Sequence, residues 1–136
     1  MRVDIQDIID AFELTDQYTE CFLDTETGNI ERINEMVMTQ NEKQEIIDRL
    51  DEHGSYRLPS SRDLDDYSIM ESFIDSLSGK AHDRLADAIS GRGAFRRFKD
   101  ALYEMGIEKE WFSFKKAEYR KIAFRWCEDA GIQYKC

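Results

Sequence analysis

Apolar side chains recur at helical spacing along most of this 136-residue chain, and a glycine follows most of these stretches. Between Thr39 and Gly54, for example, Ile46, Ile47 and Leu50 recur at such spacing. Apolar positions three and four residues apart predict helices that bury one face against a core. A glycine just past the last turn is a common helix end. The pattern therefore predicts a fold in which helices dominate.

About six helices are expected from this pattern. They are a helix over about residues 4–13; one that begins at Thr39 and stops near Gly54; one opened by Asp65 and Asp66, with Tyr67, Met70, Phe73, Ile74 and Leu77 inward, and ended by Gly79; a short one around Leu85, Ala88 and Ile89 that ends at Gly91; one with Phe95, Phe98, Ala101, Leu102 and Met105 inward that ends at Gly106; and the longest, from about Glu108 to Ala130. Asp4 is placed to cap the first helix. Thr39 and Glu42 have the spacing of a capping box, in which each side chain bonds the backbone N–H of the other residue.

Strand-forming residues follow the first helix. Residues 18–24 and 29–34 predict the two strands of a hairpin, and Gly28 suits the left-handed position in its loop. Residues 55–58, which end at the only proline, predict a third strand. Because a lone hairpin is marginal in water, it should pair with that strand or pack on helices. The predicted fold class is α+β, helix-dominated, with a small two- or three-stranded antiparallel N-terminal sheet.

The length of the chain fits one domain. We expect residues 1–136 to form a single domain, with an N-terminal helix and hairpin at about 1–58 and a helical bundle at about 62–132. A chain of this size buries roughly two thirds of the surface that its unfolded form exposes, so its core needs no disulfide or metal ion to be stable.

The chain is strongly acidic, with 29 Asp and Glu residues against 19 Lys and Arg and a formal net charge of −10. Such a surface repels phosphates, which argues against general nucleic-acid binding and against anionic membranes. The three cysteines are odd in number and the N-terminus has no apolar signal core, so we expect a cytoplasmic protein. The leading hypothesis is a non-enzymatic binding or regulatory protein whose acidic surface engages a protein partner.

Four cations interrupt this acidic chain between Gly91 and Asp100. Arginines at a helix N-terminus oppose the macrodipole, which favours anions there, and glycines let backbone amides approach a ligand. The segment is therefore a candidate site for a small anion, a phosphate-bearing ligand or local nucleic-acid backbone. Its candidate residues are Gly91, Arg92, Gly93, Arg96, Arg97 and Lys99. The alternative is a structural role, and we expect at least two of the four cations to pair with carboxylates, for which Glu71, Asp75, Asp83 and Asp87 are the candidates.

Catalytic chemistry has little support in the sequence. We recognise no nucleophile–base pair, metal cluster or cofactor loop, and we therefore predict no catalytic residue, metal ion or cofactor. His53 and His82 lie far apart without zinc-ligand spacing, and His53 falls at a helix C-terminus, where a cation is favoured. An enzyme with an unrecognised carboxylate-based site is the remaining alternative.

The cationic segment also carries a resemblance. Gly91 to Tyr103, which reads GRGAFRRFKDALY, resembles the signature of a small bacterial family known only as uncharacterised protein family 0158. Similar stretches elsewhere are Leu58-Pro59-Ser60, Tyr67 to Ile74, the hairpin, Glu110-Trp111-Phe112 and Ala123 to Cys127. The resemblance covers nearly the whole chain. It implies a bacterial cytoplasmic protein and implies nothing about its chemistry.

Overall fold

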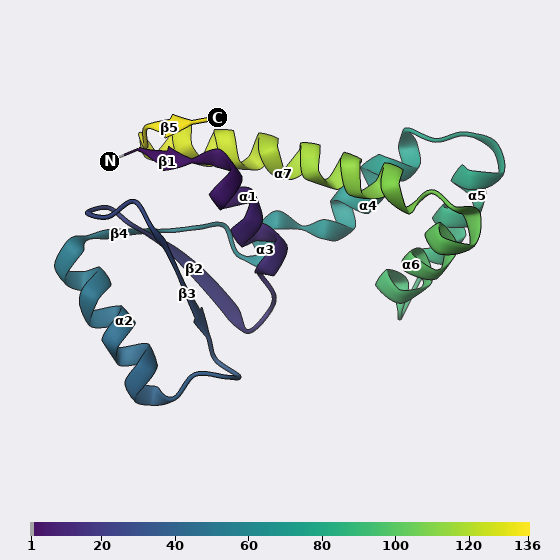
Figure 1. The fold of residues 1–136 in the computed structure, drawn as a ribbon. Coiled ribbons are helices and arrows are strands. Elements are labelled where there is room, and N and C mark those ends of the chain that lie inside the picture. Colours follow the sequence, from purple (N-terminus) through teal and green to yellow (C-terminus); the bar gives the residue numbers. More distant parts are fainter. Residues whose placement is uncertain (1) are drawn as a thin grey trace. The chain divides into compact units, whose positions relative to one another are not determined.

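The chain divides into two compact units in the computed structural model, which describes residues 2–136 (Figure 1). The first unit contains the chain up to Leu64 together with Tyr119–Cys136, and the second contains Asp65–Glu118. The single domain expected from the length stays a prediction. Helices dominate, and the first unit adds a three-stranded antiparallel sheet, which confirms the helix-dominated α+β fold class.

Six helices of ten residues or more and one single-turn helix lie among residues 2–136. The first unit holds α1 (Ile5–Leu14), α2 (Gln40–His53), α3 (Ser61–Leu64) and the last part of α7 (Glu108–Ala130), and the second holds α4 (Asp66–Asp75), α5 (Gly79–Ala88), α6 (Ala94–Met105) and the first part of α7. None of these helices is long and apolar enough to cross a bilayer. The bounds of α7 and the capping box of Thr39 and Glu42 are as the sequence predicts.

The sheet of the first unit has β2 (Thr19–Asp24) in the middle, between β3 (Ile30–Asn34) and β4 (Ser55–Arg57). Both neighbours run antiparallel to β2. Gly28, in the loop between β2 and β3, has a φ of 78°, in the left-handed region that glycine adopts readily. The hairpin and the third strand are therefore confirmed.

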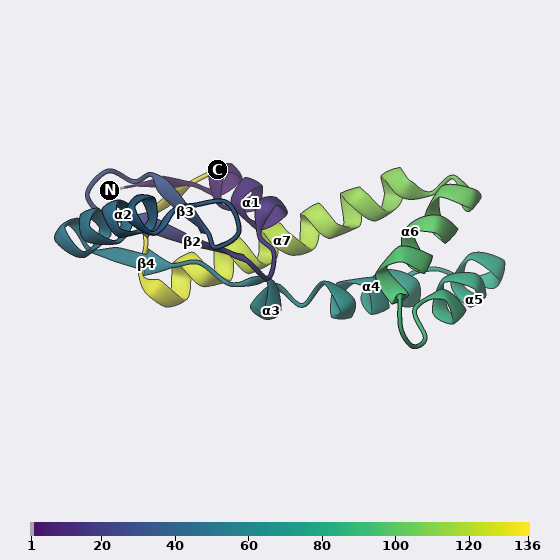
Figure 2. The same ribbon diagram turned by 90° about the horizontal axis from the view of Figure 1, so that it is seen from below.

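Helices cover both faces of this sheet. Cys21 of β2 lies beside Thr15 at the end of α1, with 3.8 Å between Sγ and Oγ1. Glu31 of β3 is paired in register with Phe22, the residue after Cys21, and forms an ion pair with Arg49 of α2. Because successive strand residues point to opposite faces, α1 and α2 lie on opposite sides of the sheet, as Figures 1 and 2 show.

The core of the first unit lies on the α1 side of the sheet. Phe12 of α1 meets Tyr119 of α7 edge to face, with ring centroids 5.7 Å apart, and both are buried. Other buried residues there include Ile5, Ile8, Ile9, Leu23, Ala123 and Cys127. The two-residue strands β1 (Val3–Asp4) and β5 (Tyr134–Lys135) pair in parallel, which the sequence analysis did not predict.

The opposite side of the sheet is less apolar. Within α2, Leu50 is the one buried residue of the fourteen in the helix. Ion pairs supplement this contact: Lys43 lies 2.6 Å from Glu35, and Arg49 lies 3.0 Å from Glu31. Polar contacts thus carry much of the attachment of α2.

Three aromatic rings form the centre of the second unit. Phe98 and Trp111 meet edge to face with centroids 4.8 Å apart, and Phe73 lies 5.4 Å from Trp111 and 6.4 Å from Phe98. These rings come from α4, α6 and α7, so one aromatic cluster holds three helices together.

Three details of the second unit differ from the sequence prediction. Gly79 does not end a helix but begins α5, because α4 stops at Asp75, where the Ser76 hydroxyl donates to the carbonyl of Phe73. Tyr67 and Phe95, expected inward, are 37% and 54% exposed. The Tyr67 hydroxyl donates instead to the carbonyl of Ile89, and α6 buries Ala94 and Phe98 in place of Phe95.

Candidate binding sites

The cationic segment forms the turn between α5 and α6. Gly91 and Gly93 have φ values of 75° and 73°, and α6 begins directly after Gly93. The Arg97 guanidinium reaches back into this turn and donates to the carbonyls of Ala88 (2.9 Å), Ser90 and Arg92. Arg97 therefore satisfies carbonyls that the end of α5 leaves without helical partners.

The ion pairs expected for this segment do not form. Among residues 2–136, no carboxylate lies within ion-pair distance of Arg92, Arg96 or Lys99, and Arg97 contacts backbone oxygens instead. The prediction that at least two of the four cations pair with carboxylates is wrong. Asp83, one of the expected partners, contacts His82 at 3.0 Å.

Two of the six predicted site residues, Arg96 and Lys99, line one hollow of about 470 Å³ in the second unit. The other residues that line it are Asp66, Met70, Phe95, Phe98, Asp100, Trp111 and Lys115. The hollow combines an apolar, partly aromatic floor with three cations and two carboxylates. Because the cations outnumber the carboxylates, it can hold an anionic group attached to an apolar body. Gly91, Arg92, Gly93 and Arg97 do not line it, which separates the six residues into two groups.

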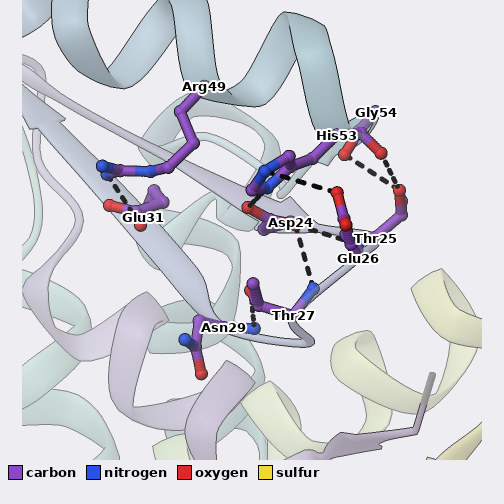
Figure 3. Close-up of polar contacts among 9 residues, drawn as sticks. All are labelled: Asp24, Thr25, Glu26, Thr27, Asn29, Glu31, Arg49, His53 and Gly54. Carbon is purple, nitrogen blue, oxygen red and sulfur yellow. Dashed lines mark hydrogen bonds and ion pairs between the residues drawn. The ribbon is translucent and has the colours of Figure 1, made fainter.

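A second cluster, which the sequence analysis did not find, joins the β2–β3 loop to the end of α2 (Figure 3). The Asp24 carboxylate is 1% exposed, and its Oδ1 accepts from the backbone N–H groups of Glu26 (2.9 Å) and Thr27 (3.1 Å). Its Oδ2 lies 2.7 Å from Nδ1 of His53. The other ring nitrogen, Nε2, lies 3.3 Å from the Glu26 carboxylate.

This cluster shifts the pKa of both partners. Burial by itself raises the pKa of Asp24, but the hydrogen bonds from His53, Thr27 and Glu26 outweigh it and leave the pKa below its usual value. The hydrogen bond to Asp24 raises the pKa of His53, and the nearby carboxylates add to this effect against desolvation. Both imidazole nitrogens face carboxylates, so His53 ties the end of α2 to Asp24 and Glu26.

Thr25 completes the same junction. Its hydroxyl donates to the carbonyls of His53 (2.8 Å) and Gly54 (2.9 Å), and its backbone N–H donates to Gly54 at 3.0 Å. Gly54 has a φ of 82°, and a Cβ there would lie 2.9 Å from the Thr25 hydroxyl oxygen. The junction is therefore a structural lock built on a close approach of the two segments.

A hollow of about 620 Å³ lies between α1 and β3 in the first unit. Its lining is apolar at Ala11, Leu14, Cys21, Ile30 and Met38, and polar at Asp7, Asp10, Asn29, Glu31 and Arg32. We refer to these ten residues as the α1–β3 groove. Four consecutive residues of its lining, 29–32, belong to the start of β3 and the residue before it.

The negative charge of the chain is concentrated in the first unit, which contains this groove. The first unit has 18 Asp and Glu residues against 10 Lys and Arg, whereas Asp65–Glu118 has 11 against 9. Asp7 and Asp10 are exposed and have no cation within ion-pair distance in the described chain. With Leu14, which is 57% exposed, they have the spacing of one helix face. That spacing is visible in the sequence, although it does not reveal the strand opposite.

Residues 2–136 contain no group of three or more His, Cys, Asp or Glu side chains arranged to hold a metal ion. Residues 2–136 form a helix-dominated α+β fold that includes an acidic groove and a hollow lined by aromatic rings and cations. The chain belongs to the uncharacterised protein family UPF0158, whose family model matches residues 1–136. No curated protein matches the chain, and no solved structure does.

Proposed function

We propose that this protein is a non-enzymatic binding protein, and that the α1–β3 groove takes a basic segment of a partner protein. The observation that carries the proposal is the placement of Asp7 and Asp10, without ion-pair partners, beside an apolar floor. A partner lysine or arginine would gain an ion pair there, and an apolar neighbour would cover Leu14 and Ile30. The surplus of acidic residues in the first unit favours a basic partner and speeds its approach.

A protein partner fits the lining better than a nucleic acid does. The groove and its surroundings repel phosphates, and its floor is made of aliphatic side chains and a thiol, with no exposed ring for base stacking. We further propose a cytoplasmic location, because an odd number of cysteines suits a reducing compartment.

The test uses a capped five-residue peptide, labelled with a fluorophore, in which lysine, valine and lysine alternate with threonine. Anisotropy titrations at low salt should show binding of this peptide and none of its glutamate-for-lysine analogue. Replacing the two groove carboxylates, in the double variant Asp7→Asn with Asp10→Asn, should weaken binding about fivefold, since each exposed ion pair contributes up to about 1 kcal/mol.

The chain offers a matched control on α2. Asp48 and Asp51 are also exposed and three residues apart, and Gln44 bonds Asp48 as Gln6 bonds Asp10. The double variant Asp48→Asn with Asp51→Asn changes the net charge equally and should leave the affinity of the peptide within about twofold of wild type. Equal losses in the two double variants would refute a role for the groove.

A second candidate function follows from the hollow of the second unit, where Arg96 and Lys99 lack carboxylate partners beside Phe95 and Trp111. We propose that this hollow binds a small anionic ligand with an apolar or aromatic body. Benzoate and phenyl phosphate are suitable probes. Either should raise the melting temperature of wild type by mass action, and Arg96→Gln should remove this shift while Lys80→Gln, an exposed lysine of α5 outside the hollow, should keep it.

A further inference from the structure

One edge of the sheet lies open along the α1–β3 groove. The strand order is β3-β2-β4, so β3 has a strand on one side only. Its pairing with β2 is bracketed by two hydrogen bonds: the N–H of Asp24 donates to the carbonyl of Asn29 at 2.8 Å, and the N–H of Glu35 donates to the carbonyl of Tyr18 at 2.9 Å. These bonds fix which residues of β3 face β2.

Main-chain groups of an antiparallel strand point alternately toward and away from its neighbour. Because Asn29 and Glu35 point toward β2, Glu31 and Ile33 do so as well, and Ile30 and Arg32 point their N–H and C=O groups outward. No described residue bonds these outward groups of Ile30 and Arg32. Two residues of β3 thus offer two donors and two acceptors at the open edge.

The side chains of the same two residues face the groove. Ile30 and Arg32 are paired in register with Leu23 and Cys21, so all four lie on the α1 face of the sheet. Both Ile30 and Arg32 line the hollow that Asp7, Asp10 and Leu14 line from α1. The open edge and the acidic groove are therefore one continuous surface.

We propose that the partner segment binds as an added antiparallel strand on β3. In an antiparallel pair, the residues opposite Ile30 and Arg32 exchange main-chain hydrogen bonds with them and have their side chains on the same face. Alternate side chains of the partner therefore lie over the groove, where Asp7 and Asp10 select lysine or arginine and Leu14 selects an aliphatic side chain. The partner is a basic, extended segment of a protein with alternating groove-facing residues.

Arg32 sets a limit on how basic the partner is. Its cation lies in the groove and has no carboxylate within ion-pair distance among residues 2–136. It opposes a lysine at the neighbouring position and tolerates an aliphatic one. Removing this charge should therefore strengthen binding of a basic strand, whereas removing the outward N–H at the same position should weaken it.

This inference rests on the proposed function, and the test distinguishes failure of groove binding from failure of strand addition on β3. It uses the lysine–threonine–valine peptide in two N-methylated forms, one methylated at valine and the second lysine, the other at the two threonines. Methylation of groove-facing residues removes the N–H groups that bond β3 and should weaken binding at least about tenfold, while methylation of the threonines should change it by less than about twofold. Equal affinities of the two methylated forms would overturn strand addition but would leave the proposal that the peptide binds in the α1–β3 groove standing. No binding of the unmethylated peptide would overturn the proposed function itself.

Variants of the protein test strand addition by changing the β3 edge instead of the peptide. Arg32→Pro removes the outward N–H and leaves the β2–β3 bonds in place, because proline is tolerated where a strand N–H faces solvent. It should weaken peptide binding, because one main-chain hydrogen bond is lost, and Arg32→Gln should strengthen binding about twofold. Wild-type peptide affinity in a folded Arg32→Pro protein would overturn the proposal, and the methylated peptides decide the matter if that variant does not fold.

Discussion

The carboxylate of Asp24 and the imidazole of His53 lie 2.7 Å apart although their positions in the chain differ by 29. This contact joins the last residue of β2 to the last turn of α2, a helix in which Leu50 is the one buried residue. A charged lock of this kind makes the attachment of α2 depend on pH, and it leads to the first prediction.

The stability of the first unit should be greatest between the ordinary pKa values of the two partners, 3.8 and 6.5. The raised pKa of His53 stabilises the fold fully below 6.5, and this contribution is lost as pH rises through the raised value. The lowered pKa of Asp24 stabilises the fold above 3.8, and this contribution is lost as pH falls through the lowered value. Melting temperatures of wild type should therefore fall from pH 6 to pH 9.

Two histidine variants isolate this effect. His53→Gln should melt lower than wild type at pH 6 and should show little further decline toward pH 9. His82→Gln, which alters a half-buried histidine of α5, should keep the wild-type profile. A wild-type decline that survives in His53→Gln would show that other groups cause it.

Gly54→Ala should lower the free energy of unfolding by about 1–3 kcal/mol, because the backbone there has a φ of 82° and the new Cβ would lie 2.9 Å from the Thr25 hydroxyl. Gly106→Ala is the control, since its φ of 67° is also positive but no atom lies within 4 Å of a Cβ. The control should cost about 1 kcal/mol from strain alone. Urea denaturation measures both, and a smaller loss at Gly54 than at Gly106 would contradict the close contact.

Arg97→Ala should lower the free energy of unfolding of the second unit by about 1–2 kcal/mol, because it leaves the carbonyls of Ala88, Ser90 and Arg92 without this donor. Its neighbour Arg96 forms no comparable contact, so Arg96→Ala should stay within about 0.5 kcal/mol of wild type. Thermal melts without added anion compare the two. The reverse order would mean that Arg97 does not hold the turn.

Phe98→Ala should lower the free energy of unfolding far more than Phe95→Ala, although the two residues are only three positions apart. Phe98 is 1% exposed and packs against Trp111, so its loss should cost about 3–5 kcal/mol. Phe95 is 54% exposed, and its loss should cost about 0.5 kcal/mol or less. Chemical denaturation checks both values, and similar losses would show that Phe95 belongs to the core after all.

Local signals in the sequence were sufficient for most elements. The capping box at Thr39 and Glu42 and the glycines that flank the final helix predicted where α2 begins and where α7 lies, because both signals act within one or two turns. Gly79 misled for the same reason: a glycine marks a left-handed residue, and such a residue occurs at either end of a loop.

The candidate sites could be predicted only in part. The cations of 92–99 stand out in an acidic chain, but their sequence does not reveal that Arg97 turns back onto carbonyls while Arg96 and Lys99 line a hollow. Asp24 and His53 meet only after the sheet and α2 have packed, and no local pattern encodes such a contact. The groove likewise forms only where α1 packs beside β3, although the helical spacing of Asp7, Asp10 and Leu14 can be seen in the sequence.

The most direct test of the account is a map of the peptide on the protein. Wild-type protein labelled with ¹⁵N is titrated with the unmethylated lysine–threonine–valine peptide, and backbone amide shifts are followed by NMR. We predict saturable shifts at Leu14, Ile30 and Arg32, which line the groove and its open edge, and none along the outer face of α2 at Asp48 and Asp51. Shifts confined to α2 or to the hollow of Arg96 and Lys99, or no saturable shifts at all, would contradict the claim that the α1–β3 groove is the binding site.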